Sequence, residues 1–232
     1  MKDRILLLSA GMDSIIAWHI LGRPECLHIT EHSKYSVKER RALTMLIHAH
    51  PNLSVRVIDM SFLRDSEKDD AEIPARNAYF ALAAARYANE VYLPCQLGEQ
   101  SIPDRSPAFF QDISALATHM YQREIVVNPV FPTQTKQDMV VSYLEQGYPV
   151  GDILLSMSCF SDKPGRCGRC AACFRTSIAL DYVGLLPEGH FVEDIWAWDG
   201  ISKYVTKMKA GEYDDRRAEQ TKHVLVARGL WK

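Results

Sequence analysis

The stretch Ile5–Ser14, with the sequence ILLLSAGMDS, decides the fold of this chain. Its first four residues are apolar, a length typical of a buried strand. A turn of small residues follows, and the amphipathic run from Asp13 to Leu21 predicts a helix. A strand, a tight turn and a helix surround an anion with backbone N–H groups and a helix N-terminus. The stretch therefore predicts a phosphate-binding turn at the start of an α/β fold.

This turn differs from two common phosphate-binding loops. No Gly-Lys-Ser/Thr follows, so it is not a Walker A loop, and its glycine spacing is not GxGxxG. Two hydroxyl groups add hydrogen-bond donors to those of the backbone. The candidate binding residues are Ser9, Ala10, Gly11, Met12, Asp13 and Ser14. A strand-to-helix turn that binds nothing is the alternative.

The composition limits the class of protein. A chain of 232 residues is long enough for one large domain, or for one domain with an appendage. With 47% hydrophobic and 24% charged residues it is typical of globular proteins. The formal net charge of −2 creates no field that would draw the chain to nucleic acid. The chain lacks an apolar run long enough for a membrane-spanning helix and a signal-peptide pattern, so we expect a cytoplasmic protein with no membrane partner and no direct nucleic-acid binding.

Strand patterns alternate with helix patterns along the first two thirds of the chain. The predicted strands are Ile5–Leu8, Cys26–Thr30, Ser54–Met60, Val91–Cys95 and Ile125–Pro129. Helices are predicted between and after them, at 13–21, 37–49, 74–88, 108–121 and 135–146, with a polar loop at 64–72. The alternation predicts a doubly wound parallel five-stranded sheet, Rossmann-like, with helices on both faces. Ligands bind such sheets beyond the carboxyl ends of the strands.

Four of the six cysteines form a cluster with the spacing C-x7-C-x2-C-x2-C. The four are Cys159, Cys167, Cys170 and Cys173. Four thiolates this close suit tetrahedral zinc, and a fully used ligand set indicates a structural ion. An iron–sulfur cluster and four unligated thiols are the alternatives. The other two cysteines, Cys26 and Cys95, fall in predicted strands and are expected to be buried, unreactive thiols.

We expect three parts in the chain. Residues 1–150 form the nucleotide-binding α/β domain, residues 151–186 a zinc-binding segment packed on it, and residues 187–232 a helical C-terminal extension. The extension holds three of the four tryptophans. Its aromatic residues either cover apolar surface or form a surface for an acceptor or partner. These are Trp196, Trp198, Tyr204, Tyr213 and Trp231.

Five short motifs occur along the chain in an order that can be compared with that of known families. They are SAGMDS (Ser9–Ser14), IPARN (Ile73–Asn77), IPDRSPAF (Ile102–Phe109), TKQDMV (Thr135–Val140) and SCF with CGRCAAC (Ser158–Cys173). Together they resemble the 7-cyano-7-deazaguanine synthase (QueC) family over about residues 4–185. The resemblance implies the HUP/PP-loop type of fold and a ligase that releases AMP and pyrophosphate in queuosine biosynthesis.

The resemblance also implies the reaction and its cofactors. ATP adenylates the carboxylate of 7-carboxy-7-deazaguanine, ammonia displaces AMP to give the amide, and a second adenylation gives the nitrile, 7-cyano-7-deazaguanine (preQ0). ATP, Mg²⁺ and structural Zn²⁺ are the expected cofactors. A homodimer is expected on the same ground.

The resemblance assigns roles to individual residues. Asp13 would orient the loop amides or bind Mg²⁺, and Lys136 would neutralise charge on the phosphates. A helix cap and a solvated lysine are the alternatives. Arg76 and Asn77 are placed near the nucleotide and the acceptor, and a helical asparagine suggests a tertiary hydrogen bond. Two further residues, Asp104 and Arg105, lie in the loop that would recognise the base, where a solvated turn is the alternative.

The sequence departs from the family pattern at four places. Ala10 replaces a glycine, which requires a negative φ or a relaxed loop. The stretch EQSIPDRSP lacks the aspartate and glycine of the family pattern, and Arg105 replaces a cysteine. Glu31–Arg41 replaces a G-Q-R-H-like stretch, and the chain continues about 45 residues past Leu186, where the family usually ends.

These departures keep two other functions open. A QueC-like enzyme of an antiphage (CBASS-type) system or of a phage would transfer the adenylated deazaguanine to a protein amine or another acceptor. A nucleotide-binding interaction module without chemistry is the third reading, and Ala10 is its only support.

Overall fold

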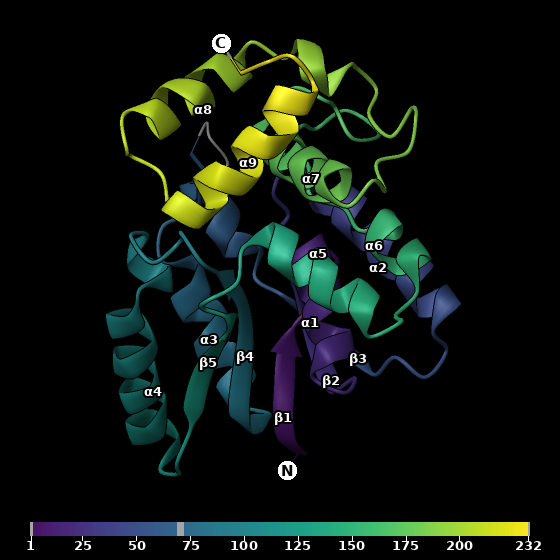
Figure 1. The fold of residues 1–232 in the computed structure, drawn as a ribbon. Helices are drawn as coiled ribbons and strands as arrows, with labels where there is room; N and C mark the ends of the chain where they lie inside the picture. The colour runs from purple at the N-terminus through teal and green to yellow at the C-terminus, as the bar shows by residue number, and fades with distance from the viewer. Residues whose placement is uncertain (1, 69–71, 232) are drawn as a thin grey trace.

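The structure is a computed structural model that describes residues 2–68 and 72–231. Its sheet strands are β1 (Lys2–Leu7), β2 (Glu25–Thr30), β3 (Val55–Asp59), β4 (Ala88–Gln96) and β5 (Val126–Phe131). Between and after them lie α1 (Met12–Ile20), α2 (Ser36–Ala49), α3 (Arg76–Ala85), α4 (Pro107–Tyr121), α5 (Lys136–Glu145) and α6 (Val150–Leu155). Figure 1 shows this alternation, which confirms the predicted α/β pattern.

The five described strands form one parallel sheet in the order β3-β2-β1-β4-β5. The central strand is β1, in which Leu6 lies opposite Cys26 of β2 and Tyr92 of β4. The order reverses beside β1, which puts the switch point of the sheet at the end of this strand. The predicted doubly wound five-stranded sheet is confirmed.

Two apolar clusters cover the two faces of the sheet. Leu6 and Leu8 face a cluster with residues of α1, α2, α5 and α6, whereas Ile5 and Leu7 face a cluster with residues of α3 and α4. This division follows from the alternation of side chains along a strand. In the second half of β1, the residues Ile5–Leu7 are buried on both faces and are all apolar, whereas Asp3 and Arg4 in the first half are exposed.

One helix boundary was predicted wrongly. The helix expected at 74–88 begins at Arg76 and ends at Ala85, and Ala88 already pairs with Lys2 as the first residue of β4. The alanine-rich sequence contains no stop signal, so strand pairing decides where the helix ends. In the loop predicted at 64–72, a 3-10 helix occupies Ser61–Ser66, and residues 69–71 lie outside the described residues.

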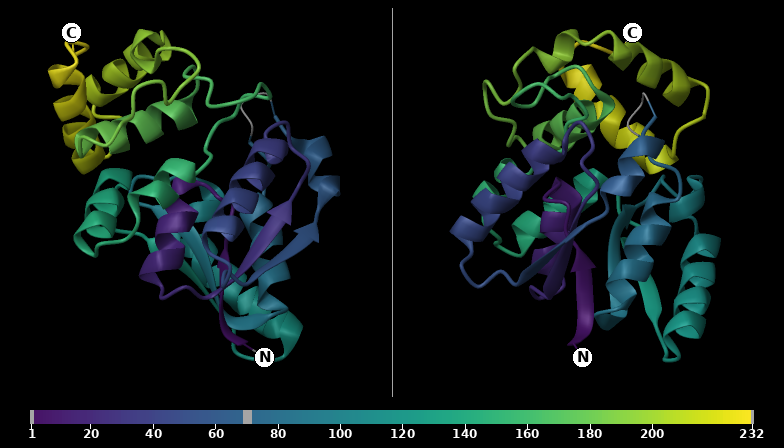
Figure 2. Two further views of the ribbon diagram at one scale, coloured as in Figure 1. Left: turned by 90° about the vertical axis from the view of Figure 1, so that its right-hand side faces the viewer. Right: turned by 180° about the vertical axis from the view of Figure 1, so that it is seen from behind.

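The last part of the described chain is helical, as predicted. It contains α7 (Ala171–Tyr182), α8 (Gly200–Lys209) and α9 (Asp215–Ala227), with a 3-10 helix at Ile195–Ala197. Figure 2 shows these helices gathered beyond the ends to which the strands point. The C-terminal extension packs its apolar residues on α7 and the cysteine segment, and the ring of Phe174 lies 4.7 Å from that of Tyr204. Covering apolar surface is therefore one role of these aromatic residues.

The extension also contacts α5 and the loop after β4 at the carboxyl edge of the sheet. Arg216 and Gln220 of α9 donate to Oδ1 of Asp138 in α5, at 2.9 and 2.8 Å. Arg217 donates to the carbonyl of Gly98, at 2.9 Å. Gly98 has a φ of +80°, and an added Cβ would lie 2.4 Å from the Arg217 side chain. Glycine at this position therefore allows α9 to approach the loop after β4.

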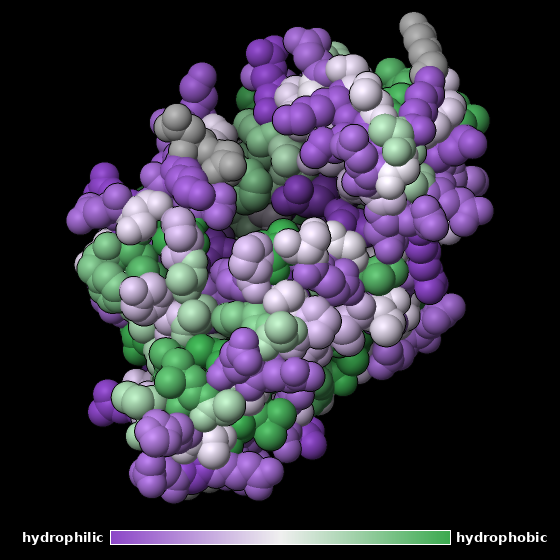
Figure 3. All heavy atoms as spheres, turned by 90° about the vertical axis from the view of Figure 1, so that its left-hand side faces the viewer, coloured by the Kyte–Doolittle hydropathy of each residue, from purple (hydrophilic) through white to green (hydrophobic). Residues whose placement is uncertain are grey.

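Within residues 2–68 and 72–231, no helix combines the length and the apolarity that a bilayer crossing requires. Exposed apolar side chains include Leu116, Met120 and Tyr121 of α4. Figure 3 shows the face that carries α4, where apolar and polar groups are interspersed. The homodimer stays a prediction.

Candidate functional site

The loop after β1 is held by its own hydroxyl groups. The N–H of Gly11 donates to Oγ of Ser9 at 3.2 Å, and Oγ of Ser14 donates to the carbonyl of Gly11 at 2.9 Å. A Cβ on Gly11 would lie 3.1 Å from Oγ of Ser158, so a larger residue here would require the Ser158 side chain to shift. The first N–H groups of α1 have no partner within the helix. The N–H groups of Gly11 and Ser14 are used within the loop, and the loop presents the N-terminus of α1 to the space beside it.

Ala10 adopts a left-handed conformation with a φ of +61°. The negative φ that the sequence requires for an unstrained alanine is therefore not observed. The side chain is fully buried, and the carbonyl of Ala10 accepts the N–H of Met157 at 2.9 Å. An alanine in this region costs about 1 kcal/mol relative to glycine. Ala10 thus adopts a backbone conformation that favours glycine, although it carries a methyl group. Its hydrogen bond to Met157 joins the loop to the segment before the cysteines.

Asp13 and Lys136 meet at the mouth of this loop. Asp13 lies in the first turn of α1, and Lys136 is the first residue of α5, after a capping box formed by Thr135 and Asp138. Their side chains form an ion pair. Gln96, the last residue of β4, donates to the second oxygen of Asp13 at 3.4 Å. Lys136 is only 8% exposed, so the solvated lysine considered from the sequence is wrong.

A cavity of about 210 Å³ adjoins the loop. The structure brings seven of the predicted nucleotide- and substrate-binding residues together in its lining: Ser9, Gly11, Asp13, Ser14, Arg76, Asn77 and Arg105. The side chains of Ala10 and Met12, in the same stretch, are fully buried and do not line the cavity. Lys136 pairs with Asp13, and Asp104 accepts a hydrogen bond from Asn77, so each of them contacts a residue that lines the cavity. The candidate site therefore lies at the carboxyl ends of β1, β2 and β4, where ligands of parallel sheets bind.

Asn77 and Asp104 join two motifs that are distant in the sequence. The backbone N–H of Asn77 donates to Oδ2 of Asp104 at 3.2 Å, and its side-chain amide donates to the Asp104 carbonyl at 3.1 Å. The expected tertiary hydrogen bond of Asn77 is confirmed. Asp104 thereby caps α3, whose preceding residue provides no side-chain cap. The next residue, Arg105, pairs with Glu99 at 2.6 Å.

The acidic end of the cavity was not predicted from the sequence. Glu31 lies directly after β2 and is 3% exposed, and Glu39 of α2 lines the same cavity. Burial and the nearby Glu31 raise the pKa of Glu39 to about 8. Arg76 donates to Oη of Tyr35 beside them, at 3.4 Å. The position of Glu31 after a predicted strand was the available signal, whereas the burial of Glu39 depends on tertiary packing.

Cys95 also lines the cavity, but it is a poor nucleophile. Burial raises the pKa of its thiol to about 12 and also raises the pKa of Cys26. Neither thiol is ionised near neutral pH, and the thiolate is the reactive form. The expectation that these two thiols are buried is confirmed, and their raised pKa values agree with the expected low reactivity.

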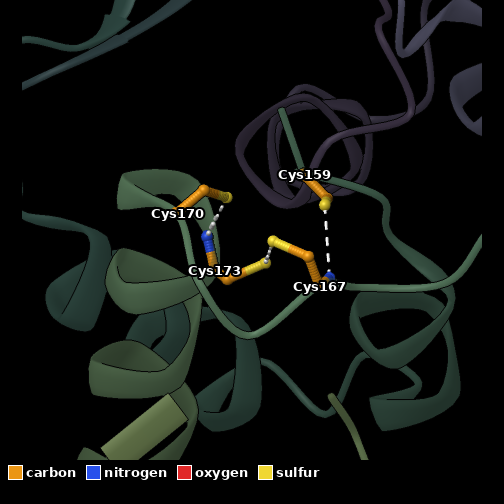
Figure 4. A group of neighbouring side chains, drawn as sticks. All are labelled: Cys159, Cys167, Cys170 and Cys173. Carbon is orange, nitrogen blue, oxygen red and sulfur yellow. Dashed lines mark hydrogen bonds between the residues drawn. The ribbon is translucent and has the colours of Figure 1, made fainter. Parts of the chain in front are cut away.

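The four clustered cysteines point toward a common centre (Figure 4). Their sulfur atoms all lie within 4.8 Å of one another, and those of Cys167 and Cys173 are 3.9 Å apart. A tetrahedral zinc with bonds of about 2.3 Å spaces its sulfurs about 3.8 Å apart. Each of the four is a free cysteine. The donor set and its spacing fit a structural zinc ion.

Lys38 of α2 supports this cluster from outside. Its Nζ donates to Sγ of Cys159 at 3.1 Å and to the carbonyl of Gly165 at 3.2 Å, and it is 8% exposed. Four thiolates and one Zn²⁺ carry a net charge of about −2. The buried ammonium offsets part of that charge and joins the cysteine segment to α2. No signal in the sequence connects Lys38 to the cysteines.

Comparison with known proteins identifies the family. A family model described as "Queuosine biosynthesis protein QueC" matches residues 56–184. The chain belongs to the QueC family. The family resemblance inferred from the motifs is therefore confirmed. The loop Ser9–Ser14 and the C-terminal extension lie outside the matched residues.

QueC-like relatives align over most of the chain. The 7-cyano-7-deazaguanine synthase of Methanoculleus marisnigri is 28% identical, over 80% of this chain and 96% of the relative. Those of Pseudoalteromonas atlantica and Xylella fastidiosa strain M12 are 26% and 27% identical, over 76% and 83% of this chain and 93% and 96% of the relatives. The alignments cover nearly all of each relative and between 76% and 83% of this chain.

A solved structure shows only a weak similarity. It is described as a predicted subunit of tRNA methyltransferase from Methanocaldococcus jannaschii, with a TM-score of 0.39 and 12% identity over 68% of this chain and 94% of that chain. The fold of this QueC-family chain is therefore assigned from its own sheet topology.

Proposed function

We propose that this chain makes 7-cyano-7-deazaguanine from 7-carboxy-7-deazaguanine, ATP and ammonia. The observation that carries the proposal is the Asp13–Lys136 pair at the mouth of the loop, in a chain of the QueC family. The loop, the two helix N-termini and the pair form an anion-binding corner beside a cavity. The names of the relatives supply the substrate class.

The first step activates a carboxylate. A carboxylate oxygen of the substrate attacks the α-phosphorus of ATP, and the bond between the α-phosphorus and pyrophosphate breaks. Negative charge grows on the α-phosphoryl group and on the leaving pyrophosphate. Lys136 and the N–H groups at the start of α1 would stabilise this charge, which is a major source of rate acceleration.

The next steps introduce nitrogen. The lone pair of ammonia attacks the acyl carbon, the bond from that carbon to AMP breaks, and a proton is lost to give the amide. The amide oxygen then attacks a second ATP and releases pyrophosphate. Loss of AMP with its electron pair, and of the two protons on nitrogen, gives the nitrile. The same corner of the site would serve both adenylations.

The residues present fit ATP and Mg²⁺. Gly11 leaves open a space that a Cβ would narrow, and Ser9, Asp13 and Ser14 border it with hydroxyl and carboxylate oxygens. When bound, Mg²⁺ neutralises phosphate charge, and such sites use few protein carboxylates. We propose Asp13 as the carboxylate that holds Mg²⁺ or orients the loop amides.

We assign the other end of the cavity to the deazaguanine base. The base carries ring N–H and amino donors, and Glu31 and Glu39 are acceptors that line the cavity. Arg76 and Asn77 would contact the nucleotide and the acceptor, and Arg105, held by Glu99, would border the base. Asp104 supports this end by fixing the start of α3.

Product analysis tests the proposal. The chain is incubated with 7-carboxy-7-deazaguanine, ATP, Mg²⁺ and ¹⁵N-labelled ammonium, and the products are identified by mass spectrometry. We expect 7-cyano-7-deazaguanine that carries the label, together with AMP and pyrophosphate. Pyrophosphate release without any labelled amide or nitrile would reject ammonia as the nucleophile.

A protein amine is the second candidate acceptor, and one observation favours it. A cavity of about 620 Å³ lies between the extension and the loop after β4. Its lining includes Trp198, Tyr204 and Tyr213 with Lys203 and Lys207. Aromatic residues of this kind are frequent in interfaces. A mass increment on a co-expressed protein, in place of the free nitrile, would establish this acceptor for an antiphage or phage type of enzyme.

The reading as an inactive module depends on Ala10. Its positive φ is strained but does not remove the N-terminus of α1 or the Asp13–Lys136 pair. We therefore favour an active enzyme. A zinc-loaded chain that releases no pyrophosphate with either acceptor would support the module instead.

A further inference from the structure

A second group of metal-ligating side chains lies apart from the cavity and the four cysteines. His19 is in the last turn of α1, His50 directly follows α2, and Asp152 is in the first turn of α6. Figure 1 shows these helices close together on one side of the sheet, and α6 packs on both α1 and α2. Asp152 is 133 residues from His19 and 102 from His50 in the sequence. Only the fold brings the three together.

The three side chains converge on one point. Nε2 of His19 and Nε2 of His50 each lie 2.7 Å from Oδ2 of Asp152. All three ligand atoms are within 4.8 Å of one another. Two imidazoles and one carboxylate form a common ligand set for zinc and neighbouring divalent metals. A tetrahedral zinc with bonds of about 2.0 Å spaces its ligands about 3.3 Å apart, so an ion needs only a small outward shift of these atoms.

The three side chains are largely buried, and that of His50 is the most exposed of them. The side chains of His19 and Asp152 are 0% and 6% exposed, whereas that of His50 is 14% exposed. The rings of Trp18, Tyr143 and Tyr148 lie 4.8, 5.3 and 4.9 Å from the His19 ring. A carboxylate buried among aromatic rings is unfavourable without a cationic partner. His50 lies on the side from which an ion can reach it.

We propose that His19, His50 and Asp152 bind a zinc ion that joins α1, α2 and α6. Three protein ligands leave one position for water. His19 lies at the end of α1 opposite to Asp13, so the ion does not contact the substrate cavity. It would instead fix the helix whose N-terminus faces the phosphates.

Metal analysis of the full chain tests this site. The protein, with its cysteine site loaded, is equilibrated with excess zinc, desalted and measured by plasma mass spectrometry. We expect about two zinc ions per chain in the wild type and about one in His50→Gln. His48→Gln, two residues earlier on an exposed position of α2, is the matched control and should keep about two. A wild type that never exceeds about one ion, or a His50→Gln variant that keeps the second, would overturn the proposal.

Cobalt substitution gives a second readout that does not depend on enzyme activity. The second equivalent of cobalt should produce d–d bands without the sulfur-to-cobalt charge-transfer bands of the cysteine site. Asp152→Asn should lose those d–d bands, while the charge-transfer bands of the first equivalent show that it is folded. Charge-transfer bands that grow with the second equivalent would place it on cysteines and refute the site.

Discussion

The ammonium of Lys136 contacts the carboxylate of Asp13 across the loop that follows β1. Lys136 begins α5 and Asp13 lies in the first turn of α1, so the N-termini of two helices converge on this contact. Helix N-termini favour anions and disfavour a lysine. Asp13 provides the counter-charge that keeps Lys136 in place. We infer that an incoming phosphate group shares Lys136 with Asp13.

Replacing Lys136 should therefore remove catalysis with little effect on the fold. For Lys136→Met we expect pyrophosphate release to fall by about 100- to 1,000-fold, because a charge that stabilises the transition state is lost. Asp13→Asn should lower it as strongly, because Lys136 then loses its partner. Lys222→Met, on an exposed position of α9, is the control. Normal turnover of either site variant would remove that residue from the catalytic assignment.

Replacing Ala10 by glycine should relieve the strain at its positive φ. We expect Ala10→Gly to raise the free energy of unfolding by up to about 0.5 kcal/mol, since the gain of about 1–2 kcal/mol in backbone conformation is largely offset by the loss of one buried methyl group worth about 0.8 kcal/mol. Pyrophosphate release should be kept or increased. Denaturant unfolding monitored by circular dichroism measures the change. A less stable Ala10→Gly variant would show that the alanine is not strained.

Glu39 should make the stability of the chain depend on pH. Burial raises the pKa of Glu39 to about 8, so the folded state binds this proton more tightly than the unfolded state. Protonated Glu39 favours the folded state, and this contribution is complete below the unfolded pKa of about 4.5. It is lost as the pH rises toward 8, the folded pKa. The melting temperature of Glu39→Gln should therefore exceed that of the wild type by a margin that grows over this range. Glu145→Gln, on an exposed position of α5, should show no such trend; an equal trend in both variants would exclude Glu39 as the cause.

Lys38 should help to retain the zinc of the four cysteines. Its Nζ donates to Sγ of Cys159, and removing such an outer partner weakens metal binding about 10- to 100-fold. For Lys38→Met we expect faster transfer of zinc to a chromogenic chelator. Lys34→Met, at an exposed position in the turn before α2, is the control. Equal transfer rates in the wild type and Lys38→Met would show that the contact has no effect on the metal.

The sequence predicted the features that local pattern determines. The apolar run at β1 and the small-residue turn located the central strand and the loop that follows it, and the spacing of the cysteines predicted that their sulfur atoms gather in one cluster. The expected hydrogen bond of Asn77 was found because an asparagine in a helix has a specific reason to be there. These inferences depend on residues close together in the chain.

The remaining features depend on packing. The end of α3 is set by the pairing of Ala88 with Lys2, not by a residue of the helix. The burial of Glu39 and the approach of Lys38 to Cys159 follow from how α2 docks. The contact of Arg217 with Gly98 requires the extension to fold back on the loop after β4. No local pattern encodes such distances, so the sequence alone could not provide them.

The most direct test of the account is the identity of the nucleotide products. The zinc-loaded chain is given ATP and Mg²⁺ with and without 7-carboxy-7-deazaguanine, and the products are separated by ion-exchange chromatography. We predict AMP and pyrophosphate that form only with the deazaguanine, and their loss in Lys136→Met. ADP and phosphate, or no turnover by a folded, zinc-loaded chain with any amine, would contradict the account.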